Sequence, residues 1–284
     1  MSPAFLRPLW LLSAAATLGI LAGCASPPTI VSATAWPAAL DAAPPADVLL
    51  LGEQHDAPDH QLLERQTVQW LAGRGQLAAL VLEMAERGHS TAGLPREATE
   101  AQVQSALQWH DAAWPWSAYG PVVMAAVRTG APVLGGNLPR TAMAEAEKDA
   151  HWDNHLAAHA REQLHTALQE GHCDMLPAAR LPTMARIQIA RDASLAATAR
   201  EAMRPGQTVL LVAGGEHVLR HRGVPTHWPR DVQSKVVSAL ARPPQGEAAG
   251  TAPATAAAGT GTDIVISTPP LPPYDACASL RPPQ

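Results

Sequence analysis

Basic charge is nowhere in excess in this 284-residue sequence. The 25 Asp and Glu residues outnumber the 20 Lys and Arg residues, the formal net charge is −5, and the basic residues form no cluster. Proteins that bind the phosphate backbone of nucleic acids usually carry a basic patch or stripe. We therefore expect no nucleic-acid partner.

Long apolar runs are also missing beyond the first residues. No later segment has the roughly 18 or more consecutive apolar residues that a transmembrane helix needs, which excludes a membrane span there. The early run from Leu9 to Ile20 follows Arg7, its only preceding charge, and is short for a bilayer. Its length and position are typical of the hydrophobic part of a secretory signal.

The tetrapeptide Leu21-Ala22-Gly23-Cys24 resembles a bacterial lipobox. We interpret residues 1–23 as a lipoprotein signal peptide and Cys24 as the lipidated first residue of the mature protein. An ordinary signal peptide cut nearby is the alternative. Because Ala25 is not Asp, the usual sorting pattern favours the outer membrane. Acyl chains such as palmitate on Cys24 would anchor the protein there, facing the periplasm or the cell surface.

Cysteine is scarce, with three residues in the whole chain. If Cys24 carries lipid, Cys173 and Cys277 remain, in a compartment that permits disulfides. These two residues are expected either to form a disulfide or to stay as separately buried thiols.

Two segments lack the bulky apolar residues that a core needs. Residues 24–46 are rich in Ala and Pro, which indicates a tether with one short element around Trp36. Residues 241–262 are rich in Pro, Gly and Thr, which predicts a disordered loop. The alternating pattern at 263–268 is typical of a strand, so the loop is an insertion. We expect one folded region over residues 47–284, long enough for a sizeable core.

Within that region, aliphatic runs alternate with helical patterns. The runs occupy residues 48–51, 80–82, 132–134, 209–212 and 264–266. Between the first two, residues 59–73 place their apolar side chains on one helical face. Strands separated by helices pair in parallel through right-handed crossovers. The prediction is an α/β fold with a mostly parallel sheet flanked by helices.

Polar residues follow the first four of these runs. They are Glu53 and His55, then Glu83, then Asn137 and Arg140, then Glu216 and His217. In parallel sheets, ligands bind outside the carboxyl ends of the strands. Two of the groups repeat one spacing, Gly-x-x-His, at residues 52–55 and 214–217. We therefore expect His55 and His217 to face a common pocket.

Seven motifs carry a resemblance that covers roughly residues 45–284. In order they are "LLGEQHD", "LVLEM", "WPWSAYGPVVMAAV", "GGNLPR", "GHCDMLP", "ARIQIARDASLA" and "LLVAGGEHVLRHRGVPTHWP". Together they resemble the ChaN family of haem-binding lipoproteins, which belongs with Tiki proteases and erythromycin esterases in one superfamily. The resemblance implies an α/β core with a smaller helical addition. It also implies haem binding in bacterial iron acquisition and a homodimer that shares haem.

The same resemblance implies a tyrosinate ligand for ferric iron. Of the two tyrosines, Tyr119 is the better candidate, because Tyr274 follows a Pro-rich tail. Trp109, Trp114 and Trp116 precede Tyr119 and would supply apolar surface for a porphyrin, or else form a small core beneath a loop. Arg140 would pair with a propionate, with a simple salt bridge as the alternative. His172, in the motif "GHCDMLP", would shape the pocket wall.

A metal-dependent hydrolase is the alternative function. His55 and His217, with Glu83 or Glu53, could hold a divalent transition metal that keeps one position open for water. Glu53 could instead act as a general base. The plainer interpretation is that the two histidines only cap strand ends.

Two further helical patterns carry polar residues. His151, His155 and His159 are spaced four apart along one helical face, which could bind metal or haem iron but is more typical of a partly solvated face. The motif "ARIQIARD" is expected to be a helix that could bring Gln188, Arg191 and Asp192 to the same site.

Overall fold

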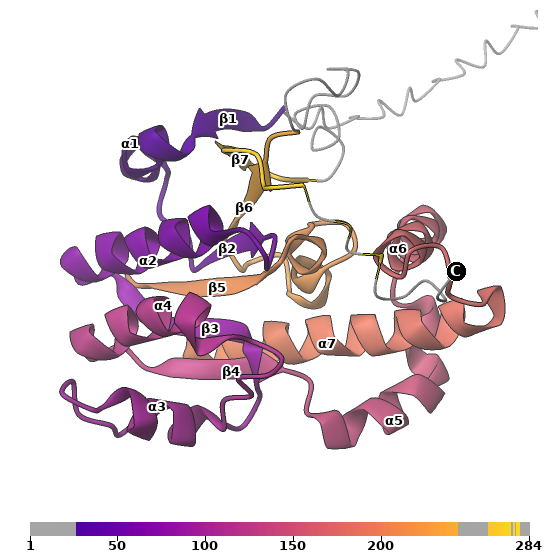
Figure 1. Cartoon of the computed structure of the whole chain (residues 1–284), viewed down its shortest axis with the longest axis horizontal. Coiled ribbons are helices and arrows are strands. Elements are labelled where there is room, and N and C mark those ends of the chain that lie inside the picture. The colour runs from indigo at the N-terminus through magenta and orange to yellow at the C-terminus, as the bar shows by residue number, and fades with distance from the viewer. Residues whose placement is uncertain (1–26, 244–260, 274, 276, 279–284) are drawn as a thin grey trace, which may run out of the picture.

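The computed structural model describes residues 27–243, 261–273, 275 and 277–278. A seven-stranded sheet with every neighbouring pair parallel forms its centre, in the order β1-β7-β6-β2-β5-β3-β4 (Figure 1). The strands are β1 (Thr29–Ser32), β2 (Val48–Glu53), β3 (Leu77–Glu86), β4 (Val133–Asn137), β5 (Thr208–Gly214), β6 (Ser234–Ala241) and β7 (Ile264–Thr268). The predicted α/β class and parallel sheet are confirmed.

Helices cover both faces of this sheet. They are α1 (Trp36–Ala42), α2 (Pro58–Gly73), α3 (Glu100–Leu107), α4 (Trp116–Thr129), α5 (Arg140–Lys148), α6 (Ala158–Gly171) and α7 (Leu181–Ala202). Leu49 and Leu51 of β2 belong to the core under α1 to α4, whereas Val48 and Leu50 belong to the core under α7. Successive side chains of a strand point to opposite faces, which is why one aliphatic run feeds both cores. All of β2 is buried, as expected for a central parallel strand.

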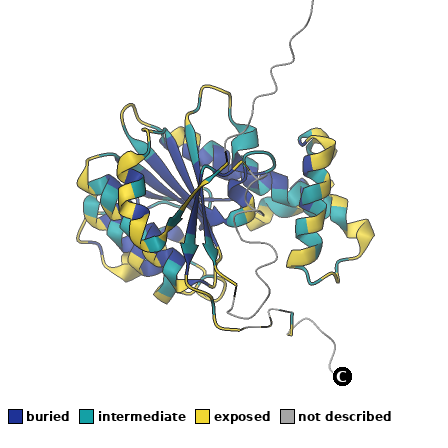
Figure 2. Ribbon diagram, turned by 90° about the horizontal axis from the view of Figure 1, so that it is seen from above, coloured by how far each residue is buried: buried dark blue, intermediate teal, exposed yellow. Residues whose placement is uncertain are grey.

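A smaller helical unit stands beside the sheet. It consists of α5, α6, the amino-terminal part of α7 and the short 3-10 helix η2 (Ala150–Asn154). Its own core contains Leu156, Leu164 and Ile189. Figure 2 shows this unit as a separate group of mostly exposed helices to the right of the buried strands. A disulfide between Cys173 and Cys277 joins the carboxyl-terminal segment to it.

The structure differs from the sequence prediction in two strands, β1 and β6. Within the segment interpreted as a tether, β1 pairs with β7, and the short element around Trp36 is α1. The indole of Trp36 is fully buried and donates a hydrogen bond to Thr67 over 2.8 Å. We did not predict β6, because its small Ser and Ala residues interrupt the aliphatic pattern.

Several sequence predictions fall outside the described residues. These are the signal peptide at 1–23, the lipidated Cys24, Tyr274 and positions 244–260 of the predicted loop. Among the residues that the structure describes, no helix is both long and apolar enough to span a bilayer.

Candidate functional site

The two Gly-x-x-His elements meet at one carboxylate. Parallel pairing of β2 and β3 with β5 brings their carboxyl ends to the same rim. There the Nε2 atoms of His55 and His217 lie 3.8 and 3.4 Å from the carboxylate oxygens of Glu83. The same carboxylate accepts a hydrogen bond over 2.8 Å from the backbone N–H of Gly214. The repeat therefore places two imidazoles on either side of Glu83.

Glycine is required at this rim because the side chains approach the backbone closely. A Cβ atom on Gly214 would lie 2.9 Å from Nε2 of His55, and one on Gly52 would lie 2.5 Å from Cγ2 of Val218. Neither distance leaves room for a methyl group without rearrangement. The glycines that follow the aliphatic runs thus permit the contact between the two elements.

Glu53 and His55 form the first ion pair of the site. The Nδ1 atom of His55 lies 2.9 Å from Oε1 of Glu53, which also accepts a hydrogen bond from the hydroxyl of Tyr119 over 2.7 Å. Gln61 donates to the other oxygen over 2.7 Å. Burial alone would raise the pKa of Glu53, but the hydrogen bond from His55 and its other donors hold it below its ordinary value. Burial would lower the pKa of His55, and the carboxylates of Glu53 and Glu83 raise it instead.

Glu83 is held by the long helix α7. The guanidinium of Arg191 donates to Oε1 of Glu83 over 2.6 Å and to Oδ1 of Asn137 over 2.9 Å. Asn137 in turn donates to the backbone carbonyl of Glu83 over 2.9 Å. Burial opposes ionisation, but His217, Arg191 and His55 hold the pKa of Glu83 well below its ordinary range. Glu83 is therefore an ionised carboxylate inside the protein.

His217 and Asp192 form the second ion pair. Their Nδ1 and Oδ1 atoms lie 2.5 Å apart, and both side chains are buried. Burial disfavours the imidazolium, but Glu83 and Asp192 outweigh it and raise the pKa of His217 to about 9. Burial raises the pKa of Asp192 to about 6. The amide of Gln188 lies 3.0 Å from Nε2 of His217, so this stretch of α7 does reach the rim.

The side chains predicted as metal ligands are hydrogen-bonded and ion-paired within the protein. The part of the chain that the structure describes contains no group of three or more His, Cys, Asp or Glu side chains placed to bind a metal. The oxygens of Glu83 are occupied by Arg191 and the Gly214 N–H, and His217 is paired with Asp192. The structure brings His55, Glu83 and His217 together, as predicted, and the metal ligation proposed for them stays a prediction.

Tyr119, the predicted iron ligand, has its hydroxyl turned toward Glu53 in this structure. Its side chain is 1% exposed, its hydroxyl donates to Glu53, and burial together with the Glu53 charge raises the pKa of the phenol far above its ordinary value. The sequence prediction assumed a phenol open to the pocket. Instead, α4 directs Tyr119 into the core beneath β2.

Two other predicted haem contacts lie away from the rim. The indole N–H of Trp116 donates to Glu100 of α3 over 2.8 Å, while Trp114 packs edge-on against His55 at 4.8 Å between ring centroids. His172 lies at the end of α6, with Nδ1 2.7 Å from the carbonyl oxygen of Leu168. Of the three tryptophans predicted to face a porphyrin, Trp114 is the one that packs on His55 and lines the cavity beside Glu83.

The predicted row of histidines serves packing in the helical unit. His155 stacks on His227 with 4.0 Å between ring centroids, and His151 packs edge-on against Trp152. His159 is exposed on α6. The predicted single helical face is wrong, because His151 lies in η2, His155 follows η2, and His159 lies in α6.

A cavity of about 310 Å³ opens beside Glu83, between the ends of β3 and β4 and the start of α5. Arg140 lines it, as the sequence analysis expected. The rest of the lining includes His89, His110, Trp114 and Met143. Both histidines follow the end of a secondary-structure element, but their segments lack the glycine and aliphatic pattern that marked the other strand ends, so we did not single them out.

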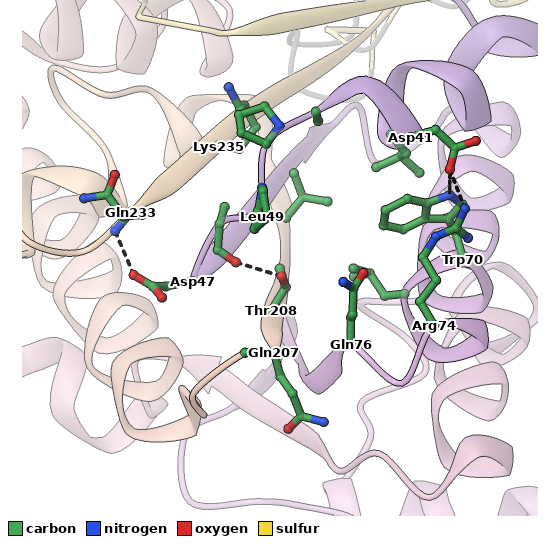
Figure 3. A pocket seen from close by; sticks show the side chains of 17 residues that line it. Asp41, Asp47, Leu49, Trp70, Arg74, Gln76, Gln207, Thr208, Gln233 and Lys235 are labelled. Carbon is green, nitrogen blue, oxygen red and sulfur yellow. Dashed lines mark hydrogen bonds and ion pairs between the residues drawn. The ribbon is translucent and has the colours of Figure 1, made fainter.

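A larger cavity of about 630 Å³ lies at the opposite, amino-terminal end of the strands (Figure 3). Its polar groups are largely satisfied by one another. The carboxylate of Asp41 accepts from the indole of Trp70 over 3.0 Å and pairs with Arg74, and Asp47 accepts from the backbone N–H of Gln233 over 2.9 Å. Size alone therefore does not make it the functional site.

Residues 39–228, well over half of the chain, match the family described as haem-binding uptake, Tiki superfamily, ChaN. A solved structure described as "Cofacial heme binding to ChaN of Campylobacter jejuni" is similar to this chain with a TM-score of 0.58 and 22% identity, over 69% of this chain and 82% of that one. At that identity the likeness shows the fold alone. No curated protein matches the chain. The family match shows that this chain belongs to the ChaN family of haem-binding uptake proteins in the Tiki superfamily.

Proposed function

We propose that the protein binds haem at the carboxyl rim of the sheet, as an outer-membrane lipoprotein of bacterial haem and iron acquisition. The cavity beside Glu83 carries this proposal. It combines an indole and a thioether, which suit a porphyrin, with imidazoles for iron and the guanidinium of Arg140 for a propionate. The family of the chain and the solved relative, which binds haem according to its description, support the same ligand.

His110 is the residue that fits the iron best. Its Nδ1 accepts a hydrogen bond from the backbone N–H of Ala113 over 3.2 Å, which orients the ring. Its side chain is exposed, and the described residues give Nε2 no hydrogen-bond partner. A neutral imidazole held in this way is a common axial ligand. Bound haem would supply a ferric centre, and the chain would hold it through His110, Trp114 and Arg140.

The cavity is small for a haem that is fully enclosed. At about 310 Å³ it lies at the low end of ligand pockets, which span roughly 300 to 1,000 Å³. Part of the porphyrin would remain open, and a second copy of the chain would cover it in a homodimer. Sedimentation velocity with and without hemin measures this, because a haem-shared dimer forms only in its presence.

The proposed anchor is the lipid on Cys24. Its position after the signal-like segment 1–23 and before the folded residues supports a protein held close to the membrane surface. Mass spectrometry of the mature amino terminus tests it. A diacylated or triacylated Cys24 is expected, and a free terminus at another residue would contradict it.

Hemin titration of the purified protein tests haem binding directly. A Soret band should saturate at a fixed stoichiometry, and His110→Ala should weaken binding by at least about tenfold. His89→Ala is the matched control, since it removes another imidazole of the same cavity. Tyr119→Phe should keep the spectrum of the bound haem, whereas loss of the ferric charge-transfer band in that variant would restore Tyr119 as the ligand.

A further inference from the structure

A cavity of about 320 Å³ in the helical unit plays no part in the haem proposal. It lies between η2, α6 and the amino-terminal part of α7 (Figure 1). It shares no lining residue with the cavity beside Glu83. A ligand held in this cavity would therefore bind at a place separate from the carboxyl rim.

Positive charge is in excess among the side chains that line this cavity. They include two arginines, Arg161 and Arg186, but a single carboxylate, that of Asp153. Both oxygens of Asp153 accept hydrogen bonds from Arg186 over 2.7 Å, and Asp149 adds a negative charge near Arg186 from outside the lining. Arg161 donates to the backbone carbonyl of Asp153 over 2.7 Å and forms no ion pair within the described residues. Most of its five N–H donors are therefore available to an anion.

His165 supplies a second donor beside Arg161. It lies four residues further along α6, so the two side chains share one helical face. The Nε2 atom of His165 is buried and has no hydrogen-bond partner within the described residues. Burial and the charge of Arg161 lower the pKa of His165, so the imidazole is neutral near pH 7 and can carry its one N–H on Nε2. A buried donor without an acceptor is costly, and an anion beside Arg161 would provide that acceptor.

Apolar side chains form another part of the lining. Trp152 of η2 and Ile189 of α7 line the cavity, and both belong to the small core of the helical unit. Such a wall suits the apolar body of an organic anion, whereas an inorganic phosphate would leave charged oxygens against it without hydrogen bonds. The volume of about 320 Å³ lies at the low end of ligand pockets, so the ligand is small.

We propose that this cavity binds a small organic monocarboxylate, with the carboxylate between Arg161 and His165 and the apolar body against Trp152. A guanidinium offers a carboxylate two parallel N–H donors, and the imidazole N–H adds a third. The bound carboxylate neutralises the excess charge of the lining and gives the buried Nε2 its partner. This site goes beyond haem binding and does not depend on it.

Isothermal titration calorimetry of the full chain with benzoate tests the site. The wild type should bind one benzoate per chain, and inorganic phosphate at least about tenfold more weakly. Arg161→Gln and His165→Leu should each weaken benzoate binding by about tenfold or more. Arg200→Gln and His159→Leu make the same changes at exposed positions of α7 and α6, and should bind as the wild type does. No saturable binding of benzoate, equal binding of phosphate, or unchanged affinity in Arg161→Gln would overturn the proposal and leave Nε2 of His165 to a water molecule.

The indole N–H signals in NMR spectra locate the benzoate in the wild type, without a substitution that could disturb the fold. Trp152 lines the proposed site, Trp114 the cavity beside Glu83 and Trp70 the cavity at the amino-terminal end of the strands. Once each signal is assigned by replacing its tryptophan with Phe, benzoate should shift that of Trp152 and leave the other two unchanged. A shift of Trp114 or Trp70 with none of Trp152 would contradict the proposal. Neither experiment involves hemin, so this proposal and the haem proposal can fail separately.

Discussion

Glu83 is the residue around which the rim is organised. It is ionised although almost fully buried, with Arg191 and His217 beside its Oε1 atom and His55 beside its Oε2 atom. Burying a carboxylate is tolerated only when its charge is compensated and its oxygens accept hydrogen bonds. Arg191 meets both needs, and the Gly214 N–H supplies a further donor.

Replacing Arg191 should therefore destabilise the fold. In Arg191→Met the guanidinium that pairs with Glu83 is lost, so the negative charge of the buried carboxylate is only partly neutralised. We therefore expect the free energy of unfolding to fall by about 3 kcal/mol. Urea denaturation measures this. Arg87→Met, which breaks the exposed pair with Glu201, is the control and should have a much smaller effect. Equal effects of the two substitutions would show that Arg191 does not compensate Glu83.

His217 should make stability depend on pH in an alkaline window. Its folded pKa of about 9 is above its ordinary value of 6.5, so its contribution is complete below about pH 6.5 and disappears as the pH rises through 9. At 1.36 kcal/mol per unit, the contribution is about 3 kcal/mol. Asp192, with a folded pKa of about 6, titrates below this window.

Urea denaturation between pH 6 and 10 should show this decline in the wild type. His217→Gln removes the ionisable group, so its stability should fall much less over the same range. His159→Gln, an exposed substitution on α6, should behave as the wild type. A decline in His217→Gln as steep as in the wild type would assign the pH dependence to another group.

At the scale of elements, the strands that could be predicted from the sequence are those that contain an aliphatic run. The runs at β2, β3, β4, β5 and β7 were found, because strands of a parallel sheet covered on both faces are apolar along most of their length. Strand β6 was missed, since its residues are small, and β1 was missed, since four residues become a strand only through pairing with β7.

The site, like the fold, could be predicted only in part from the sequence. Glu53, His55, Glu83 and His217 were found because they follow aliphatic runs in the sequence. The burial of Glu64 in α2 was not predicted, because a carboxylate within an amphipathic helix is expected to face solvent until the packing of the helix is known. The burial of Tyr119 was not foreseen for a related reason: the rotation of α4 about its axis decides whether the hydroxyl faces the cavity or the core.

The disulfide joins two segments that are far apart in the chain. Cys173 and Cys277 are separated by 104 residues, and closing such a loop stabilises a fold by about 4 to 5 kcal/mol in the chain-entropy model. Thiol labelling of the unreduced, unfolded protein should therefore find neither cysteine reactive, and reduction should lower the melting temperature. Two labelled cysteines would contradict the bridge.

At the scale of the whole molecule, the parallel sheet separates two cavities. One lies at the carboxyl rim beside Glu83, and the larger one lies at the amino-terminal end beneath α1. Parallel α/β sheets bind ligands at the carboxyl end, where loops are free to vary and strand ends present polar groups. The central claim is that haem occupies the carboxyl rim, although the other cavity is larger.

Hemin titration of two cavity-filling variants tests this claim most directly. Met143→Trp places an indole in the cavity at the carboxyl rim, and Pro45→Trp does the same in the larger cavity at the amino-terminal end. If haem binds at the carboxyl rim, Met143→Trp should lose the Soret band of the complex, whereas Pro45→Trp should bind hemin as the wild type does. The reverse pattern, with binding intact in Met143→Trp and lost in Pro45→Trp, would contradict the account.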